Sequence, residues 1–162
     1  MGIDLSFKSP GHRFNVRAAA IIRHEGYILC DQERGTNFSF LPGGRIQRGE
    51  SSAKALQREL GEELEIDVQV GQPLIITQSF FDGIHSERYH ELGFYYVVER
   101  PENLAFAPGQ ICRSIIEDGG WYDFSWVEAT PEELVKAQVE PKAIHHHFID
   151  LPAHPVHAII HE

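Results

Sequence analysis

The feature that most constrains this chain is a block of acids behind two glycines, GGRIQRGESSAKALQRELGEELEI, at residues 43–66. Leucines recur there at helical spacing and serines precede them as caps, which predicts a helix over residues 51–64. Residues three and four apart on a helix are neighbours, so Glu59, Glu62 and Glu63 share one face, away from the leucine stripe. Like charges so placed destabilise a helix unless something neutralises them. The block therefore predicts either a solvated acidic surface or a site for divalent cations.

The two glycines before the helix favour the cation site. Glycine lets the backbone approach a ligand closely, and a free carbonyl of Gly43 or Gly44 could ligate a metal ion. Mg²⁺ prefers oxygen ligands and keeps several waters, which the phosphates of a substrate can replace. Three carboxylates on one rigid face can therefore hold such ions against a polyphosphate.

Residues 44–66 resemble the signature box of the Nudix hydrolases, the MutT-type superfamily. The family pattern is G-x5-E-x7-R-E-U-x-E-E-x-G-U, in which U is a bulky aliphatic residue. The matching residues are Gly44, Glu50, Arg58, Glu59, Leu60, Glu62, Glu63 and Ile66. Glu65 departs from the pattern, because the family has a glycine there, at the helix end where positive φ is common. Either the helix ends differently or strain is stored, and we expect the metal face to be kept.

The resemblance implies a fold and an activity. The fold is an α/β/α sandwich with a central mixed β-sheet, in one domain over residues 1–162. The activity is metal-dependent hydrolysis of a nucleoside diphosphate linked to another group, with Mg²⁺ or Mn²⁺ as cofactor and water attacking phosphorus. The implied metal ligands are Glu50, Glu59, Glu62, Glu63 and the carbonyl of Gly44.

Two further catalytic roles follow from the resemblance. Arg58 would hold a carboxylate in place through a charge-assisted hydrogen bond. The general base varies within the family and lies in the box or on a later loop. The loop before Trp121 offers Glu117 and Asp118, and we place Glu117 first, with an exposed loop acid as the commoner role for such a residue.

Substrate contacts are less constrained by the sequence. A base needs an aromatic or apolar platform and a few polar groups, and an arginine can meet phosphate. Aromatic residues in strands are usually core, and scattered arginines usually face solvent. Markers of the ADP-ribose and dinucleoside-polyphosphate relatives are missing after the box. Their absence identifies no substrate, so we expect a general nucleotide hydrolase that acts on a nucleoside triphosphate, a modified nucleotide or a nucleotide sugar. The candidate substrate-binding residues are Gly43, Gly44, Arg23, Phe40 and Phe81.

The composition restricts the classes of binding partner that this chain can have. The chain has 162 residues and a net charge of −10, which argues against nucleic acid backbones and anionic membranes as partners. Its two cysteines suggest reduced thiols, and the first residues contain no apolar stretch long enough for a signal peptide, so we expect a cytoplasmic protein. The expected partner is a small nucleotide. Homodimers occur in the family, and the sequence indicates no interface.

Periodicity predicts the other elements. A turn at Glu25-Gly26 joins the first two strands into a hairpin. Thr130 caps a late helix that has Pro131 at its first position. The predicted strands cover residues 14–22, 26–32, 65–70, 73–81, 91–99 and 121–128, and the later helices 130–137 and 143–150.

Two features leave alternatives open. The histidines from residue 145 onward could form a soft metal site, but no cysteine or spaced acid completes it, so solvated or partly buried histidines are favoured. Glu65 is the one feature that supports a binding module that senses a nucleotide without cleaving it. An RNA-end hydrolase is disfavoured, because the chain has no basic stripe.

Overall fold

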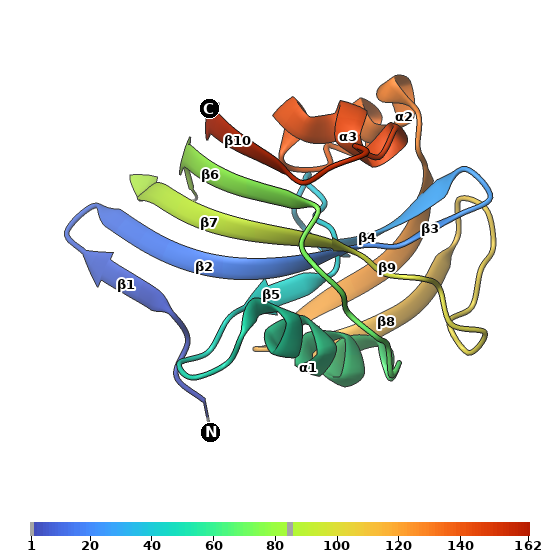
Figure 1. The fold of residues 1–162 in the computed structure, drawn as a ribbon, viewed down its shortest axis with the longest axis horizontal. Helices are drawn as coiled ribbons and strands as arrows, with labels where there is room; N and C mark the ends of the chain where they lie inside the picture. The colour runs from blue at the N-terminus through green and yellow to red at the C-terminus, as the bar shows by residue number, and fades with distance from the viewer. Residues whose placement is uncertain (1, 84–85) are drawn as a thin grey trace.

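The computed structural model describes residues 2–83 and 86–162, and its strands form two sheets that cross one another (Figure 1). The first sheet has the strand order β1-β2-β7-β6-β10, with β5 against β2. Two of its pairs, β2 with β7 and β10 with β6, are parallel, so the sheet is mixed. The α/β class and the mixed central sheet are therefore confirmed. Its strands are β1 (Ser6–Ser9), β2 (His12–Ile21), β5 (Gly43–Arg45), β6 (Ile75–Asp82), β7 (Arg88–Val97) and β10 (Val156–His161).

The second sheet is antiparallel and has the order β3-β4-β9-β8. Three α-helices and a short 3-10 helix complete the described elements, with α1 near one edge of the first sheet and α2 and α3 together near the other (Figure 1). The strands of this sheet are β3 (Arg23–His24), β4 (Tyr27–Glu33), β8 (Ile111–Glu117) and β9 (Gly120–Glu128). The helices are α1 (Ser52–Leu64), α2 (Pro131–Lys136), η2 (Lys142–Ile144) and α3 (His145–Ile149).

Strand β2 separates two hydrophobic cores. Successive side chains of a strand point to opposite faces. Ala18 and Ala20 accordingly pack with leucines of α1, whereas Ala19 and Ile21 pack with Leu134 of α2 and Phe148 of α3. The central sheet is thus covered on both faces, which places α1 and its acids against one side of it.

Helix α1 begins and ends as its sequence predicts. The Ser51 hydroxyl caps the start by accepting from the Lys54 N–H at 3.2 Å. Glu65 ends it in the left-handed conformation, with φ 56° and ψ 35°, and its N–H donates to the Gly61 carbonyl. A non-glycine residue pays roughly 1–2 kcal/mol for this conformation. The helix therefore keeps the ending that the family's glycine favours, at a cost in strain.

Arg113 of β8 holds this strained end. Its Nη2 lies 3.2 Å from Glu65 Oε1, and its Nε donates to the Glu63 carbonyl at 2.5 Å. Asn103 Nδ2 donates to the Glu65 carbonyl at 3.2 Å. These contacts tie the last turn of α1 to the second sheet.

Two predictions about strands are wrong. Residues 65–70 form no strand, although Ile66 and Val68 are buried against the core. The expected hairpin is also different, because β2 lies in the first sheet and the turn at Glu25-Gly26 joins β3 to β4 of the second. Strands β1, β3, β5, β8 and β10 were not predicted.

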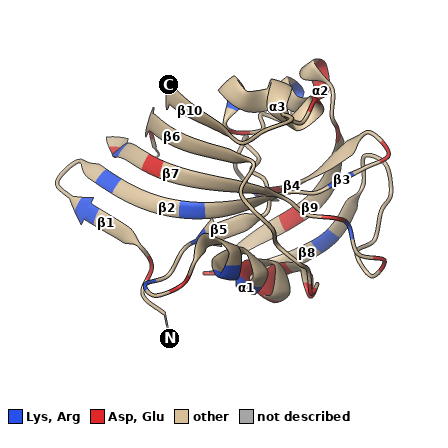
Figure 2. Cartoon of the chain, viewed as in Figure 1, with Lys and Arg blue, Asp and Glu red and all other residues tan. Residues whose placement is uncertain are grey.

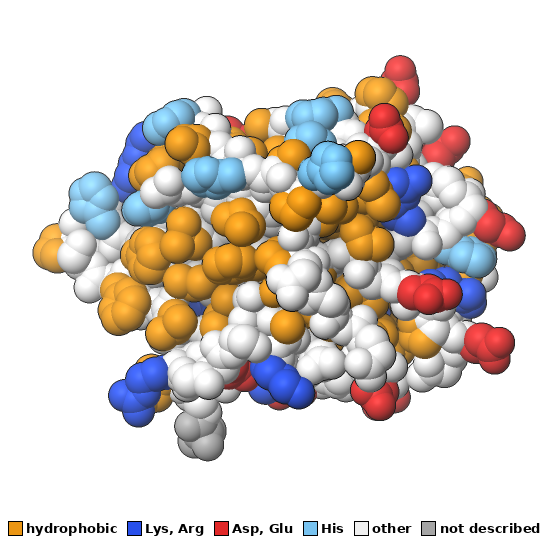
Figure 3. Space-filling model, in the orientation of Figure 1, with side chains coloured by type: hydrophobic (Ala, Val, Ile, Leu, Met, Phe, Trp, Pro, Cys, Tyr) orange, Lys and Arg blue, Asp and Glu red, His pale blue; other side chains and the backbone are white. Residues whose placement is uncertain are grey.

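One face of the first sheet exposes an aromatic row. Hydrophobic side chains and histidines gather over β1, β2, β7 and β6 in Figure 3. Neighbouring ring centroids along the row lie 4.4–6.1 Å apart. The row crosses five strands and consists of Phe7, Phe14, His90, Phe80 and His161.

No helix within the described ranges is long and apolar enough to cross a membrane.

Candidate metal centre

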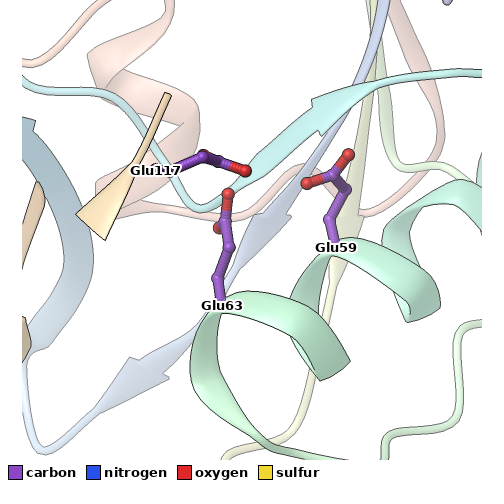
Figure 4. A group of neighbouring side chains, drawn as sticks. All are labelled: Glu59, Glu63 and Glu117. Carbon is purple, nitrogen blue, oxygen red and sulfur yellow. The ribbon is translucent and has the colours of Figure 1, made fainter. Parts of the chain in front are cut away.

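Three glutamates from two elements meet beside α1. Glu59 and Glu63 are one helical turn apart on α1, and Glu117 is the last residue of β8 (Figure 4). One carboxylate oxygen from each lies within 4.8 Å of the others. Glu59 and Glu63 are buried, whereas Glu117 is exposed. Helix periodicity thus supplies two carboxylates, and the hairpin of β8 and β9 supplies the third.

The three carboxylates have raised pKa values. Burial, reinforced by Asp31, Glu59 and Glu117, raises the pKa of Glu63 to about 9. Burial is also the largest cause of the raised pKa of Glu59 and of Glu117. Within residues 2–83 and 86–162, the buried Oε2 of Glu63 has no hydrogen-bond partner. Buried carboxylates need a proton or a cation to be neutralised, and hard oxygen donors so gathered fit Mg²⁺ or Mn²⁺.

Arg58 organises the other acids of the helix. Its Nε donates to Glu50 Oε1 at 2.6 Å and its Nη1 to Glu59 Oε1 at 2.7 Å. Glu62 lies 3.5 Å from the same Nη1, and its side chain is 57% exposed. The bond from Arg58 lowers the pKa of Glu50. Glu50 and Glu62 therefore sit beside Arg58 rather than in the cluster of three, and Figure 2 shows both signs of charge gathered on α1.

The glycines allow a close approach. A Cβ built on Gly44 would collide with the Glu59 carboxylate, and one on Gly43 would collide with the backbone of Ala18. Gly43 has φ 155° and pairs with Ala19, while Gly44 pairs with Ala18. Strand β5 thus lies between β2 and the acids because it carries no side chain at these positions.

The remaining predicted substrate-binding residues, Phe40, Arg23 and Phe81, lie in different parts of the structure. Phe40 lies beside Arg17, whose guanidinium carbon is 5.4 Å from the ring centroid. Arg23 is exposed on β3, where it pairs with Ile28. Phe81 stacks on Tyr89 with centroids 5.0 Å apart. The contacts described for Arg23 and Phe81 include no residue of the three-glutamate cluster.

Asp31 was not predicted as a site residue. Burial raises its pKa to about 7, with Glu117 adding to the shift and Arg17 opposing it. Leu29 and Asp31 alternate along β4 and pair with Trp126 and Phe124, which are both buried in the core. An acid at an inward position of an apolar strand was the sequence feature that could have revealed it.

The histidine-rich tail supplies none of the ligands of the cluster. His145 is buried, and its Nε2 lies 2.6 Å from the Val139 carbonyl oxygen. His146, His154, His157 and His161 are exposed. Among the residues that the structure describes, the group of acids and histidines close enough to share a metal ion is Glu59, Glu63 and Glu117.

Comparison with known proteins places the chain in a family. The NUDIX domain model matches residues 12–143. A low-salt glycan biosynthesis protein, Agl8, of Haloferax volcanii is 34% identical over 46% of this chain and 53% of its own length. The CTP pyrophosphohydrolase of Escherichia coli is 33% identical over 54% of this chain and 69% of its own. The first match thus spans about half of the relative.

Solved structures support the fold. The mutator MutT protein of Bacillus halodurans superposes with a TM-score of 0.63 and 16% identity, covering 91% of this chain and 89% of that one. The ORF135 protein of Escherichia coli gives a TM-score of 0.54 with 21% identity, covering 91% of this chain and 96% of that one. At such identities the likeness concerns the fold alone.

Proposed function

The chain belongs to the NUDIX family, and we propose that it is a pyrophosphohydrolase that uses Mg²⁺ or Mn²⁺ to cleave the diphosphate linkage of a nucleotide. The observation that carries the proposal is the cluster of Glu59, Glu63 and Glu117, which holds two buried carboxylates with raised pKa values and an unpartnered oxygen on Glu63. Such a cluster is costly without a cation, which is expected of a site built to bind one.

The glutamates and Arg58 have different roles in this proposal. Glu59 and Glu63 hold the cation from one helical face, and Glu117 faces them from β8. When bound, the metal supplies polarisation of a phosphoryl oxygen and a lowered pKa of water. Arg58 fixes the Glu59 carboxylate through a 2.7 Å bond and is itself fixed by Glu50. Glu50 and Glu62 therefore act through Arg58 in this proposal.

Glu117 is the proposed proton acceptor. It is the exposed member of the cluster, so water can reach it. Burial, together with the charges of Glu59 and Asp118, raises its pKa. A raised pKa makes a carboxylate a stronger base near neutral pH. Asp118 follows it in the turn, at φ 48°.

The substrate belongs to the same proposal. The Escherichia coli relative is a CTP pyrophosphohydrolase by name, which makes nucleoside triphosphates the first compounds to test. Modified nucleotides and nucleotide sugars follow. A cytoplasmic location remains part of the proposal, as does a small-molecule partner in place of nucleic acid.

The test compares hydrolysis with metal binding. Purified protein is incubated with nucleoside triphosphates, oxidised nucleotides and nucleotide sugars, with Mg²⁺ and then with EDTA, and products are separated by chromatography. We expect EDTA-sensitive release of a nucleoside monophosphate. Glu63→Gln should lower kcat by roughly 10²–10⁴ and weaken Mg²⁺ binding in calorimetry. Glu102→Gln, an exposed loop variant, is the matched control.

Two outcomes would overturn the proposal. Unchanged activity in Glu63→Gln would remove the metal centre from the reaction. Tight nucleotide binding without product, in a folded and metal-loaded protein, would favour the binding module. Glu65, which supported that alternative, lies outside the three-glutamate cluster and ends the helix.

A further inference from the structure

A stripe of polar side chains crosses the first sheet on the face opposite the aromatic row. In register, Asn15 of β2 lies beside Glu91 of β7, and Glu91 beside Ser79 of β6. Two residues along, Arg17 of β2 lies across Gly93 from Thr77 of β6. Asn15, Thr77 and Ser79 are at most 6% exposed. Buried polar groups on a sheet face need partners, so this stripe calls for a ligand or an internal network.

The stripe continues into a hydrophobic core on the same face. The next row along the sheet contains Ala19, Tyr95 and Ile75, which all pack with Leu134 and Phe148. The change from apolar to polar side chains occurs between this row and Arg17. A sheet face that only had to cover a core would stay apolar there.

Arg17 is a cation without an ion pair. Its Nη2 donates to the Leu41 carbonyl at 2.7 Å, and its guanidinium lies over Phe40. Among the described residues, no carboxylate oxygen lies within 4.0 Å of it, whereas Arg58 and Arg113 both have such partners. Burial lowers the pKa of Arg17, but the charges of Glu91, Asp31 and Glu63 outweigh burial and raise it. Arg17 therefore stays charged, with donors available, among acids that it does not touch.

Glu91 is the complementary acceptor. It lies beside Asn15 in register. Burial raises the pKa of Glu91, whereas Arg17 and the side chain of Asn15 oppose that shift, and the Asn15 Oδ1 accepts from the Ser6 hydroxyl at 2.7 Å. This network orients the Glu91 carboxyl and leaves it at least one further acceptor site in either protonation state. Arg17 and Glu91 occupy diagonal positions on the paired strands β2 and β7, so both side chains can reach the same ligand. Figure 2 shows basic residues on β2 and an acidic one on β7.

We propose that this stripe binds the base of the substrate and selects one that carries both a ring carbonyl and an exocyclic amino group. Arg17 donates to the carbonyl, Glu91 accepts from the amino group, and Phe40 offers an aromatic surface. Guanine and cytosine carry both groups, whereas adenine lacks the carbonyl and uracil lacks the amino group. The inference rests on the proposed function, because it assigns the base subsite of that substrate.

A phosphate contact at Arg17 is the competing assignment. Glu91 lies on the diagonal from Arg17 across the paired strands, and Asp31 also acts on Arg17, so these two acids would repel a phosphate that approached the guanidinium. A neutral base with one acceptor and one donor meets no such repulsion. The acids therefore favour the base, while the phosphates belong at the metal centre.

The test measures base preference with and without turnover. For the wild-type protein, kcat/KM is compared for CTP, GTP, ATP and UTP in Mg²⁺, and the affinities of CMP, GMP, AMP and UMP are measured by calorimetry. We expect cytosine and guanine compounds to be favoured by about tenfold or more. Arg17→Gln and Glu91→Ala should each remove most of that preference, and Glu91→Ala should leave Mg²⁺ affinity unchanged, because Glu91 does not act on the pKa of Glu63 or Glu59. Arg48→Gln, an exposed arginine, is the control.

The outcomes separate the two proposals. An equal loss for all four nucleotides in Arg17→Gln would assign Arg17 to phosphate and overturn the inference, as would a wild-type protein without base preference. Thermal unfolding checks that each variant folds, and Glu91→Ala carries the test if Arg17→Gln does not fold. Monophosphate binding with the expected preference, but without hydrolysis, would support the stripe and overturn only the proposed activity.

Discussion

Helix α1 and its surroundings contain the same residue type in two electrostatic settings. On one side, Glu50 and Glu62 sit beside Arg58, and the arginine lowers the pKa of Glu50. On the other, Glu63 is buried among acids, and its pKa is raised to about 9. Glu59 belongs to both, because it accepts from Arg58 and lies in the cluster of three.

The difference shows that spacing on the helix does not decide the role of each glutamate. Glu62 and Glu63 are adjacent in sequence, yet one is 57% exposed and the other is buried. What separates them is the protein that covers each side: β8 brings Glu117 toward Glu63, whereas Glu62 faces solvent and Arg58. Pairing stabilises the first side by itself, and the second side requires a proton or a cation.

Removing Arg58 breaks the paired side and has the largest expected effect on stability. Arg58→Ala leaves Glu50 and Glu59 without their strongest donor and frees the Arg45 carbonyl. We expect a loss of about 2–3 kcal/mol in the free energy of unfolding, measured by urea denaturation. Glu50→Gln in the Arg58→Ala background should cost little more, because both changes remove one interaction. A loss below about 0.5 kcal/mol for Arg58→Ala would contradict a structural role.

A pH series on the metal-free protein tests the unpaired side. Unfolded Glu63 loses its proton near pH 4.5, whereas folded Glu63 keeps it until about pH 9. The unfolded state therefore binds fewer protons between these values, and stability falls as pH rises through them. Glu63→Gln should flatten this slope and be more stable at pH 8 by about 1–2 kcal/mol.

Two comparisons sharpen that pH experiment. Saturating Mg²⁺ should remove the slope in the wild-type protein, because the cation replaces the proton. Glu62→Gln should keep the wild-type slope, since its side chain is more than half exposed. Thermal unfolding, monitored by circular dichroism at each pH, measures the stability of the wild-type protein, with and without Mg²⁺, and of both variants. A wild-type slope that survives in Glu63→Gln would show that another group carries it.

The smallest expected effect is at the end of the helix. Glu65→Gly relieves the cost of a left-handed residue and loses the ion pair with Arg113, which is weak because the Glu65 side chain is 74% exposed. We expect a net gain below about 1 kcal/mol, seen as a small rise in Tm by calorimetry. Glu65→Ala keeps the strain and loses the pair, so it should be slightly destabilising. A gain in Glu65→Ala would show that the ion pair is unfavourable.

Local patterns predicted what lies within one element. The cap at Ser51, the helix over residues 51–64 and the shared face of Glu59 and Glu63 depend on neighbours along the chain, and the structure contains them, whereas Glu62 turns toward solvent and Arg58. The strand predicted over residues 65–70 does not form, because alternating apolar residues there cover the core without pairing to a strand. Alternation reports which side is buried, and it does not reveal whether a hydrogen-bonding partner exists.

Contacts between distant segments could not be read from the sequence. Arg17 enters the proposed base subsite because β2 pairs with β7, and Glu117 joins the cluster because β8 folds back on β9. Both depend on strand order. The sequence offered Glu117 as a loop acid, and the structure places it at the end of a strand whose exposed residues lack a clear period.

The pairing of β2 with β7 also sets when the site can form. His12 pairs with Arg88 and Ile21 with Val97, so β2 has no parallel partner until that later segment has been made. The third glutamate comes later still, at residue 117. During synthesis, α1 can form early, because its hydrogen bonds are local. Glu59 and Glu63 meet the third glutamate of the cluster only after most of the chain has been synthesised. Assembly of the site is therefore a late step in folding, because it requires the closure of long loops. We expect it to appear as a slow phase in folding kinetics.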